Sequence, residues 1–119
     1  MKDLLTNENP IYVSPTLAAM LGLPAAIFLE WFHNLLQESQ CKMDGKPWIE
    51  ANSGVLQEVL PFMAQSQIRH IVKRLYKMRL LEIYLRDGKK WYTLDYNRLE
   101  NGVAKYRAKH GMTTGDEVV

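Results

Sequence analysis

The chain is poor in the residues that build cross-links and reactive centres. Its only cysteine is Cys41, so no disulfide can form within it, and this favours a reducing compartment. The three histidines lack cysteine partners at zinc spacing, and no phosphate-binding glycine loop is present. Glu30 and His33 have the spacing of a di-iron ligand pair, but the chain holds no second copy. We therefore expect no catalytic residues, metal or cofactor, and no enzyme.

Long apolar runs are also missing. Residues 1–10 contain no apolar core of signal-peptide length. The apolar stretch near Leu17–Leu29 is interrupted by Gly22 and Pro24 and is too short to span a bilayer. We expect a cytoplasmic protein without a membrane partner, and 119 residues suffice for one domain.

The net charge of +2 hides an uneven distribution. Residues 1–63 carry three Lys/Arg against seven Asp/Glu, or −4, whereas residues 64–119 carry twelve against six, or +6. This split indicates one basic face, the electrostatic footprint of a nucleic-acid binder. A solvated helix surface would give the same count, so charge alone leaves both interpretations open.

The first half of the chain predicts two helices. Residues 11–13 suggest a short strand, and Ser14 with Pro15 forms a helix start, because serine caps the N-terminus and proline suits the first turn. That helix should stop at Gly22. A longer helix is predicted from Pro24 to about Ser39. Its apolar face comprises Ile27, Phe28, Trp31, Phe32, Leu35 and Leu36.

The middle of the chain is less regular. The segment QCKMDGK is predicted to be a loop with its turn at residues 44–45. Residues 47–50 suggest a short strand. A helix capped by Asn52 or Ser53 should reach Leu60 and end there, because Pro61 disfavours helical geometry in the residue before it.

A basic helix is predicted over residues 65–79, starting near Ala64 or Gln65. Apolar residues recur along it at helical spacing. They are Ile68, Ile71, Val72, Leu75 and Met78.

A β-hairpin should follow, because Asp87-Gly88 between strand-forming residues favours a type I′ turn. That turn pairs Arg86 with Lys89, Tyr84 with Trp91, Ile83 with Tyr92 and Leu81 with Leu94. The expected core face comprises Leu81, Ile83, Leu85, Tyr92 and Leu94, and the outer face Glu82, Tyr84, Arg86, Lys89, Trp91 and Thr93.

Three regions follow from this order of elements. They are an irregular arm (1–10), a domain (11–99), and a tail (100–119) that is first basic and then disordered. A last helical segment is predicted over residues 95–110, weakened by Gly102. The basic residues flanking Tyr106 make either an electrostatic arm or merely a soluble end.

The order of helix, tight break, basic helix and hairpin predicts a mainly α fold with a small antiparallel β-hairpin wing, a winged helix-turn-helix. In such folds the second helix enters the major groove, so the basic helix is the candidate recognition helix. Its N-terminal residues would read bases and its later cations would contact phosphates. The candidate residues are Gln65, Ser66, Gln67, Arg69, His70, Lys73, Arg74 and Lys77.

The wing supplies a second set of candidates. Arg86, Lys89 and Lys90 crowd its tip, and like charges in close pairing are unfavourable without a compensating anion, such as DNA phosphate. Tyr84 and Trp91 face each other across the strands. This pair either stacks on unpaired bases or packs within the protein.

Three segments carry a resemblance to a known family. LPFMAQSQIRHIVKRLYKMRLLE, KKWYTLDYNRLE and AAIFLEWFHNLLQES resemble the winged-helix domains of phage and plasmid replication proteins, including DnaD-type replisome organisers, over residues 11–99. The chain departs from their pattern at Ala64, where Ser or Thr is usual, and at Arg79, where Gly is common. The resemblance implies DNA binding in replication initiation, with replication proteins as partners.

Two alternatives stay open, because one fold serves several functions. A transcriptional repressor would bind palindromic half-sites as a dimer. A protein-interaction module, possibly a homodimer, would use the aromatic wing and the acidic N-terminal half. Double-stranded rather than single-stranded DNA is the expected partner.

Overall fold

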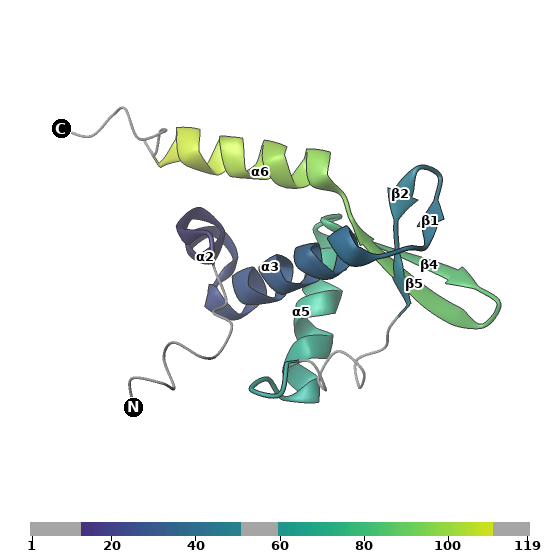
Figure 1. The fold of residues 1–119 in the computed structure, drawn as a ribbon. Coiled ribbons are helices and arrows are strands. Elements are labelled where there is room, and N and C mark those ends of the chain that lie inside the picture. Colours follow the sequence, from purple (N-terminus) through teal and green to yellow (C-terminus); the bar gives the residue numbers. More distant parts are fainter. Residues whose placement is uncertain (1–12, 51–59, 111–119) are drawn as a thin grey trace, which may run out of the picture.

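The computed structural model describes residues 13–50 and 60–110, and within them the fold is mixed α/β (Figure 1). The elements are α2 (Pro15–Leu21), α3 (Leu23–Glu38), β1 (Lys42–Met43), β2 (Lys46–Pro47), β3 (Ile49–Glu50), α5 (Gln65–Lys77), β4 (Leu81–Arg86), β5 (Lys89–Leu94) and α6 (Tyr96–Lys109). Strands β1 and β2 pair with each other, and a separate antiparallel sheet has the order β3-β5-β4.

The first two helices follow the capping signals. Ser14 Oγ accepts a hydrogen bond from the backbone N–H of Leu17 at 3.2 Å, which confirms the predicted helix start. Gly22, with φ of +92°, ends α2 and also precedes α3. The strand predicted over residues 11–13 lies mostly outside the described residues, and Val13 is not in a strand.

Helix α3 supplies the centre of the core. Phe28, Phe32 and Leu36 are completely buried, as predicted, and the rings of Phe28 and Phe32 stack with centroids 5.6 Å apart. The other three predicted apolar positions are only partly buried. Ala25 and Leu29 are buried in their place, so the buried stripe is rotated toward the side of the helix that carries these two residues.

The segment predicted as a loop is a small hairpin instead. Asp44 and Gly45 form its turn with φ of +54° and +75°, and β1 and β2 flank it. The predicted 47–50 strand is divided at Trp48, and only Ile49–Glu50 joins the larger sheet. Trp48 is buried, and its Nε1–H donates to the Met43 carbonyl at 3.1 Å. This inward-facing indole holds the small hairpin in place.

The helix predicted from Asn52 or Ser53 to Leu60 lies outside the described residues except for its last position. Leu60 is buried at the start of a turn through Pro61, and α5 follows. Its N-cap is Ala64, which offers no side-chain hydrogen bond.

Helix α5 ends two residues earlier than predicted, in a Schellman motif. The Arg79 N–H donates to the Tyr76 carbonyl and the Leu80 N–H to the Leu75 carbonyl, both at 3.0 Å. Arg79 occupies the left-handed position of this motif with φ of +62°. Because the helix stops at Lys77, Met78 leaves the buried stripe and is 40% exposed, so its predicted core position was wrong.

The β4–β5 hairpin has the predicted register throughout, and its turn residues have φ of +53° and +75°, as a type I′ turn requires. Two face assignments were wrong. Leu85 is 66% exposed, because it lies near the hairpin tip. Thr93 is 1% exposed, and Lys46 and Pro47 of β2 line the same small cavity as this residue. Strand β2 therefore covers part of the face that the pattern left to solvent.

Helix α6 is capped by Asp95, whose Oδ1 accepts from the Arg98 N–H at 3.0 Å. The helix extends past residue 99, the predicted end of the domain, and includes Gly102. It lies beside α2 (Figure 1), and none of its residues is buried. Residues 111–119, predicted to be disordered, lie outside the described residues.

Candidate nucleic-acid interface

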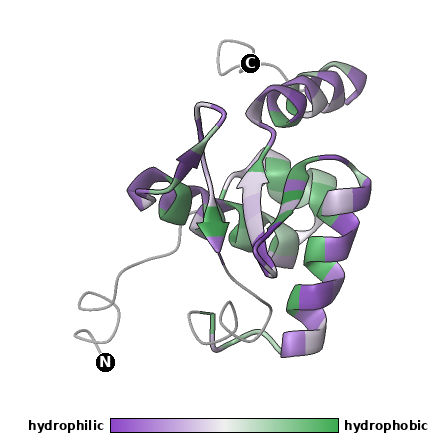
Figure 2. Cartoon of the chain, turned by 90° about the vertical axis from the view of Figure 1, so that its right-hand side faces the viewer, coloured by the Kyte–Doolittle hydropathy of each residue, from purple (hydrophilic) through white to green (hydrophobic). Residues whose placement is uncertain are grey.

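Every predicted site residue of α5 is exposed, while Ile68, Ile71 and Leu75 face the core. Figure 2 shows the resulting hydrophilic side of this helix. The helix contains no Asp or Glu. Helical periodicity places one row of four residues farthest from the core. The row comprises Ser66, His70, Lys73 and Lys77.

The cations of α5 are not equivalent. Within the described residues, Arg69, Lys73 and Lys77 have no acidic partner within 4 Å. Arg74 instead donates from Nη1 to the Leu21 carbonyl at 2.6 Å. Because that carbonyl ends α2, the bond satisfies a group that the helix leaves unpaired. Arg74, predicted among the phosphate contacts, is therefore held against the protein.

The hairpin tip is exposed and basic, as its sequence indicates, but its charges are partly compensated within the chain. Arg86 Nε lies 3.8 Å from Asp87 Oδ2, and Lys89 Nζ lies 3.8 Å from Glu50 Oε2. Lys90 has no acidic partner within 4 Å among the described residues. Exposed pairs at this distance contribute little, so the tip remains available to an anion.

Tyr84 and Trp91 are register partners, as predicted. Within the described residues, however, the ring of Tyr84 packs against the ring of Trp48, with centroids 6.0 Å apart and the ring planes inclined at 55°. Tyr84 is 49% exposed. The Trp91 ring is half-buried, and its buried Nε1 has no acceptor in the described part of the chain. An aromatic cluster on the outer face thus includes Trp48, which the pairing pattern did not single out.

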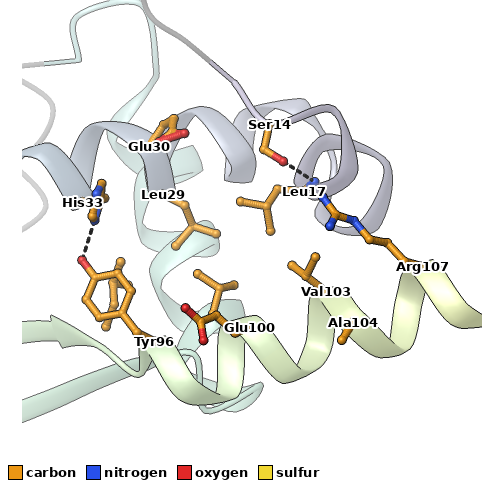
Figure 3. A pocket seen from close by; sticks show the side chains of 12 residues that line it. Ser14, Leu17, Leu29, Glu30, His33, Tyr96, Glu100, Val103, Ala104 and Arg107 are labelled. Carbon is orange, nitrogen blue, oxygen red and sulfur yellow. Dashed lines mark hydrogen bonds between the residues drawn. The ribbon is translucent and has the colours of Figure 1, made fainter. Parts of the chain in front are cut away.

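Away from α5 and the hairpin, a cavity of about 490 Å³ lies among α2, α3 and α6 (Figure 3). Leu17, Leu29 and Val103 give it an apolar lining. His33 Nδ1 and Tyr96 Oη are hydrogen-bonded at 2.7 Å, and burial raises the pKa of Tyr96. Around Glu30 and His33, as elsewhere in the described residues, no group of three His, Cys, Asp or Glu side chains is placed to hold a metal ion.

Sequence reasoning missed a groove beside the C-terminus of α5. It has a volume of about 530 Å³ and lies among α5, β4 and the start of α6. Tyr76, Arg79 and Arg98 line it. The signal for Arg79 was present in the sequence, because this residue stands where glycine is expected.

Comparison of the chain with family models, curated proteins and solved structures found no match in any of the three. Among the described helices, none combines the length and the apolar character needed to cross a membrane.

Proposed function

We propose that this chain is a DNA-binding protein that presents α5 to the major groove and the β4–β5 hairpin to the neighbouring backbone. The observation that carries the proposal is the exposed side of α5, which is free of acidic residues. Arg69, Lys73 and Lys77 lie on it without an acidic partner among the described residues. Phosphate neutralisation by such cations supplies essentially all of the non-specific affinity of DNA-binding proteins and a large share of their specific affinity.

The order of elements supports a winged helix. Helix α3 precedes β3, α5 precedes the β4–β5 hairpin, and β5 lies between β3 and β4 in the sheet. In that fold the helix before the hairpin is the one that enters the groove. The helix expected to precede α5 falls on residues 51–59, outside the described part of the chain.

The two ends of α5 suit different contacts. Gln65, Gln67 and Arg69 occupy its first turns, where glutamine can pair with adenine and arginine with guanine. Lys73 and Lys77 lie farther along and suit phosphate oxygens. Arg69→Ala should therefore change sequence preference, and Lys73→Ala should weaken binding to all sequences about equally.

A fluorescence-anisotropy titration on duplex and single-stranded DNA across a salt series tests the proposal. We expect affinity for the duplex to fall steeply with salt, and the slope to decrease by about one in Lys73→Ala. Lys42→Ala, which removes an exposed lysine from β1, is the matched control. If wild-type protein shows no affinity for duplex at low salt even at micromolar concentration, the proposal is wrong.

A role in phage- or plasmid-type replication initiation rests on the resemblance described above. Selection from random duplexes separates this role from repression, because a dimeric repressor would enrich a two-fold-symmetric site.

A protein-interaction role has a separate observation in its favour. Phe62 and Leu85 are large apolar residues, 56% and 66% exposed. Light scattering of the double variant Phe62→Ser/Leu85→Ser tests self-association through them. A wild-type chain that is monomeric and still binds DNA argues against this alternative.

A further inference from the structure

Arg79 has a backbone conformation that is costly for arginine. Its φ of +62° lies in the left-handed region, where residues with a Cβ are disfavoured and glycine is not. The Schellman motif at the end of α5 needs such a residue at this position. Residues strained in this way cluster at functional sites, which draws attention to the side chain of Arg79.

Three cations line the groove of about 530 Å³ at this end of α5. Lys77 belongs to α5, Arg79 to the turn that follows it, and Arg98 to the first turn of α6. The groove therefore gathers positive charge from segments that are separated in sequence. Its exposed aromatic residue, Tyr76, is 52% accessible to solvent.

The two acidic residues that line the same groove are already engaged. Glu82 Oε2 accepts from Lys46 Nζ at 2.9 Å. Asp95 Oδ1 accepts from the N–H of Arg98 at 3.0 Å and caps α6. Within the described residues, the charged side-chain nitrogens of Lys77, Arg79 and Arg98 form no ion pair within 4 Å. The groove thus has three cations against two carboxylates, one of which is paired with Lys46, and this excess of positive charge suits an anionic ligand.

The groove is continuous with the candidate interface on α5. Lys77 is the last residue of the outermost row on that helix and also lines the groove. A polyanion that follows the row from Ser66 toward Lys77 therefore reaches Arg79 and Arg98 next. Arginine suits phosphate well, because its planar guanidinium donates two parallel hydrogen bonds.

We propose that this groove binds a backbone phosphate of the DNA that contacts α5, so that the interface extends across Arg79 onto α6. This inference rests on the proposed function. On this proposal, the positive charge of Arg79 contacts phosphate, and this contact accounts for an arginine at a position that favours glycine. Tyr76, at the edge of the groove, contacts the adjoining sugar.

The decisive variant is Arg79→Gly, because strain and charge have opposite effects there. Removing the strain should raise the melting temperature, and removing the charge should weaken DNA binding. Loss of one phosphate contact should lower affinity about five- to tenfold at 0.1 M salt and reduce the salt slope by about one. Arg98→Gln should weaken binding similarly without raising the melting temperature.

The matched control is Arg107→Gln on α6, since Arg107 faces Thr16 of α2, with Nη2 at 3.5 Å from Oγ1, and does not line the groove. The proposal is overturned if Arg79→Gly or Arg98→Gln binds duplex like wild type while Lys73→Ala is impaired. The DNA-binding proposal would then stand. Absence of binding by wild-type protein would overturn both. Binding of inorganic phosphate by wild type but not by Arg79→Gly, with the DNA affinity of the two proteins equal, would assign the groove to free phosphate instead.

Discussion

Lys73 and Arg74 are adjacent cations on one helix, and the structure gives them different roles. Lys73 lies in the outermost row of α5 without an acidic partner among the described residues. Arg74 donates to the Leu21 carbonyl at the end of α2. We predict that Lys73→Ala impairs DNA binding with little effect on stability, and that Arg74→Ala does the reverse.

The magnitude follows from the contact that each variant loses. The Arg74 bond measures 2.6 Å and is charge-assisted. Such bonds contribute about 1.5–3 kcal/mol, and the exposure of Arg74 places it at the low end of that range. For a chain of 119 residues a loss of about 1.5 kcal/mol should lower the melting temperature by about 6 °C. Lys73→Ala removes no side-chain hydrogen bond or ion pair among the described residues, so its free energy of unfolding should stay within about 0.5 kcal/mol of wild type.

Thermal unfolding followed by circular dichroism measures the first effect, and anisotropy titrations across a salt series measure the second. Lys73→Ala should reduce the salt slope by about one, and Arg74→Ala should leave it unchanged. Arg74→Lys, which keeps the charge but loses the planar donor geometry, should also be destabilised. If Arg74→Ala unfolds at the wild-type temperature and has the reduced slope, then Arg74 faces the DNA and the assignment is refuted.

Two glycine substitutions should change the free energy of unfolding in opposite directions. Gly102→Ala in α6 should stabilise the protein by about 0.5–1 kcal/mol, because glycine weakens helices and the new Cβ would lie 3.6 Å from Met20 Cε, an ordinary contact. Gly88→Ala should destabilise it by about 1 kcal/mol, since its φ is +75°; urea unfolding measures both, and equal signs would contradict the argument. Burial raises the pKa of Tyr92 and Tyr96, so the folded chain keeps phenolic protons that the unfolded chain releases. Their stabilisation is complete below the ordinary pKa of about 10 and is lost as pH rises through the folded values; phenolate absorbance should show late-titrating tyrosines that become ordinary in denaturant. Ser39→Ala should cost about 1 kcal/mol, because Ser39 Oγ donates to the Trp48 carbonyl at 2.5 Å and joins α3 to the strands; an unchanged urea midpoint would show that this bond is dispensable.

Local signals predicted the parts of the fold that depend on neighbouring residues. The Asp87-Gly88 turn fixes the hairpin register, because a two-residue loop leaves one pairing of the strands. Ser14 and Gly22 delimit α2 for equally local reasons. The helical spacing within α5 likewise identified its four buried residues.

The misses depend on contacts between distant segments. The burial of Thr93 reflects β2, which arrives from nearly fifty positions earlier in the chain. The engagement of Arg74 requires the end of α2 to lie beside α5, and no periodicity within α5 contains that information. Arg79 was noticed only as a departure from a pattern. Its positive φ and the two cations that share its groove depend on the three-dimensional arrangement and are not visible in the sequence.

Helix α2 has only seven residues, yet it touches three other helices. Gly22 joins it to α3 through a single residue. Its last carbonyl receives Arg74 from α5, and its residues Thr16 and Met20 lie against α6. A chain shortened to begin at Leu23 would therefore lose Leu21 from the core, and α6 would be left with its contacts through Tyr96 and Leu99 but none with α2. The sensible N-terminal limit for a minimal fragment is Val13, before the serine that caps α2, even though every residue proposed to contact DNA lies far downstream.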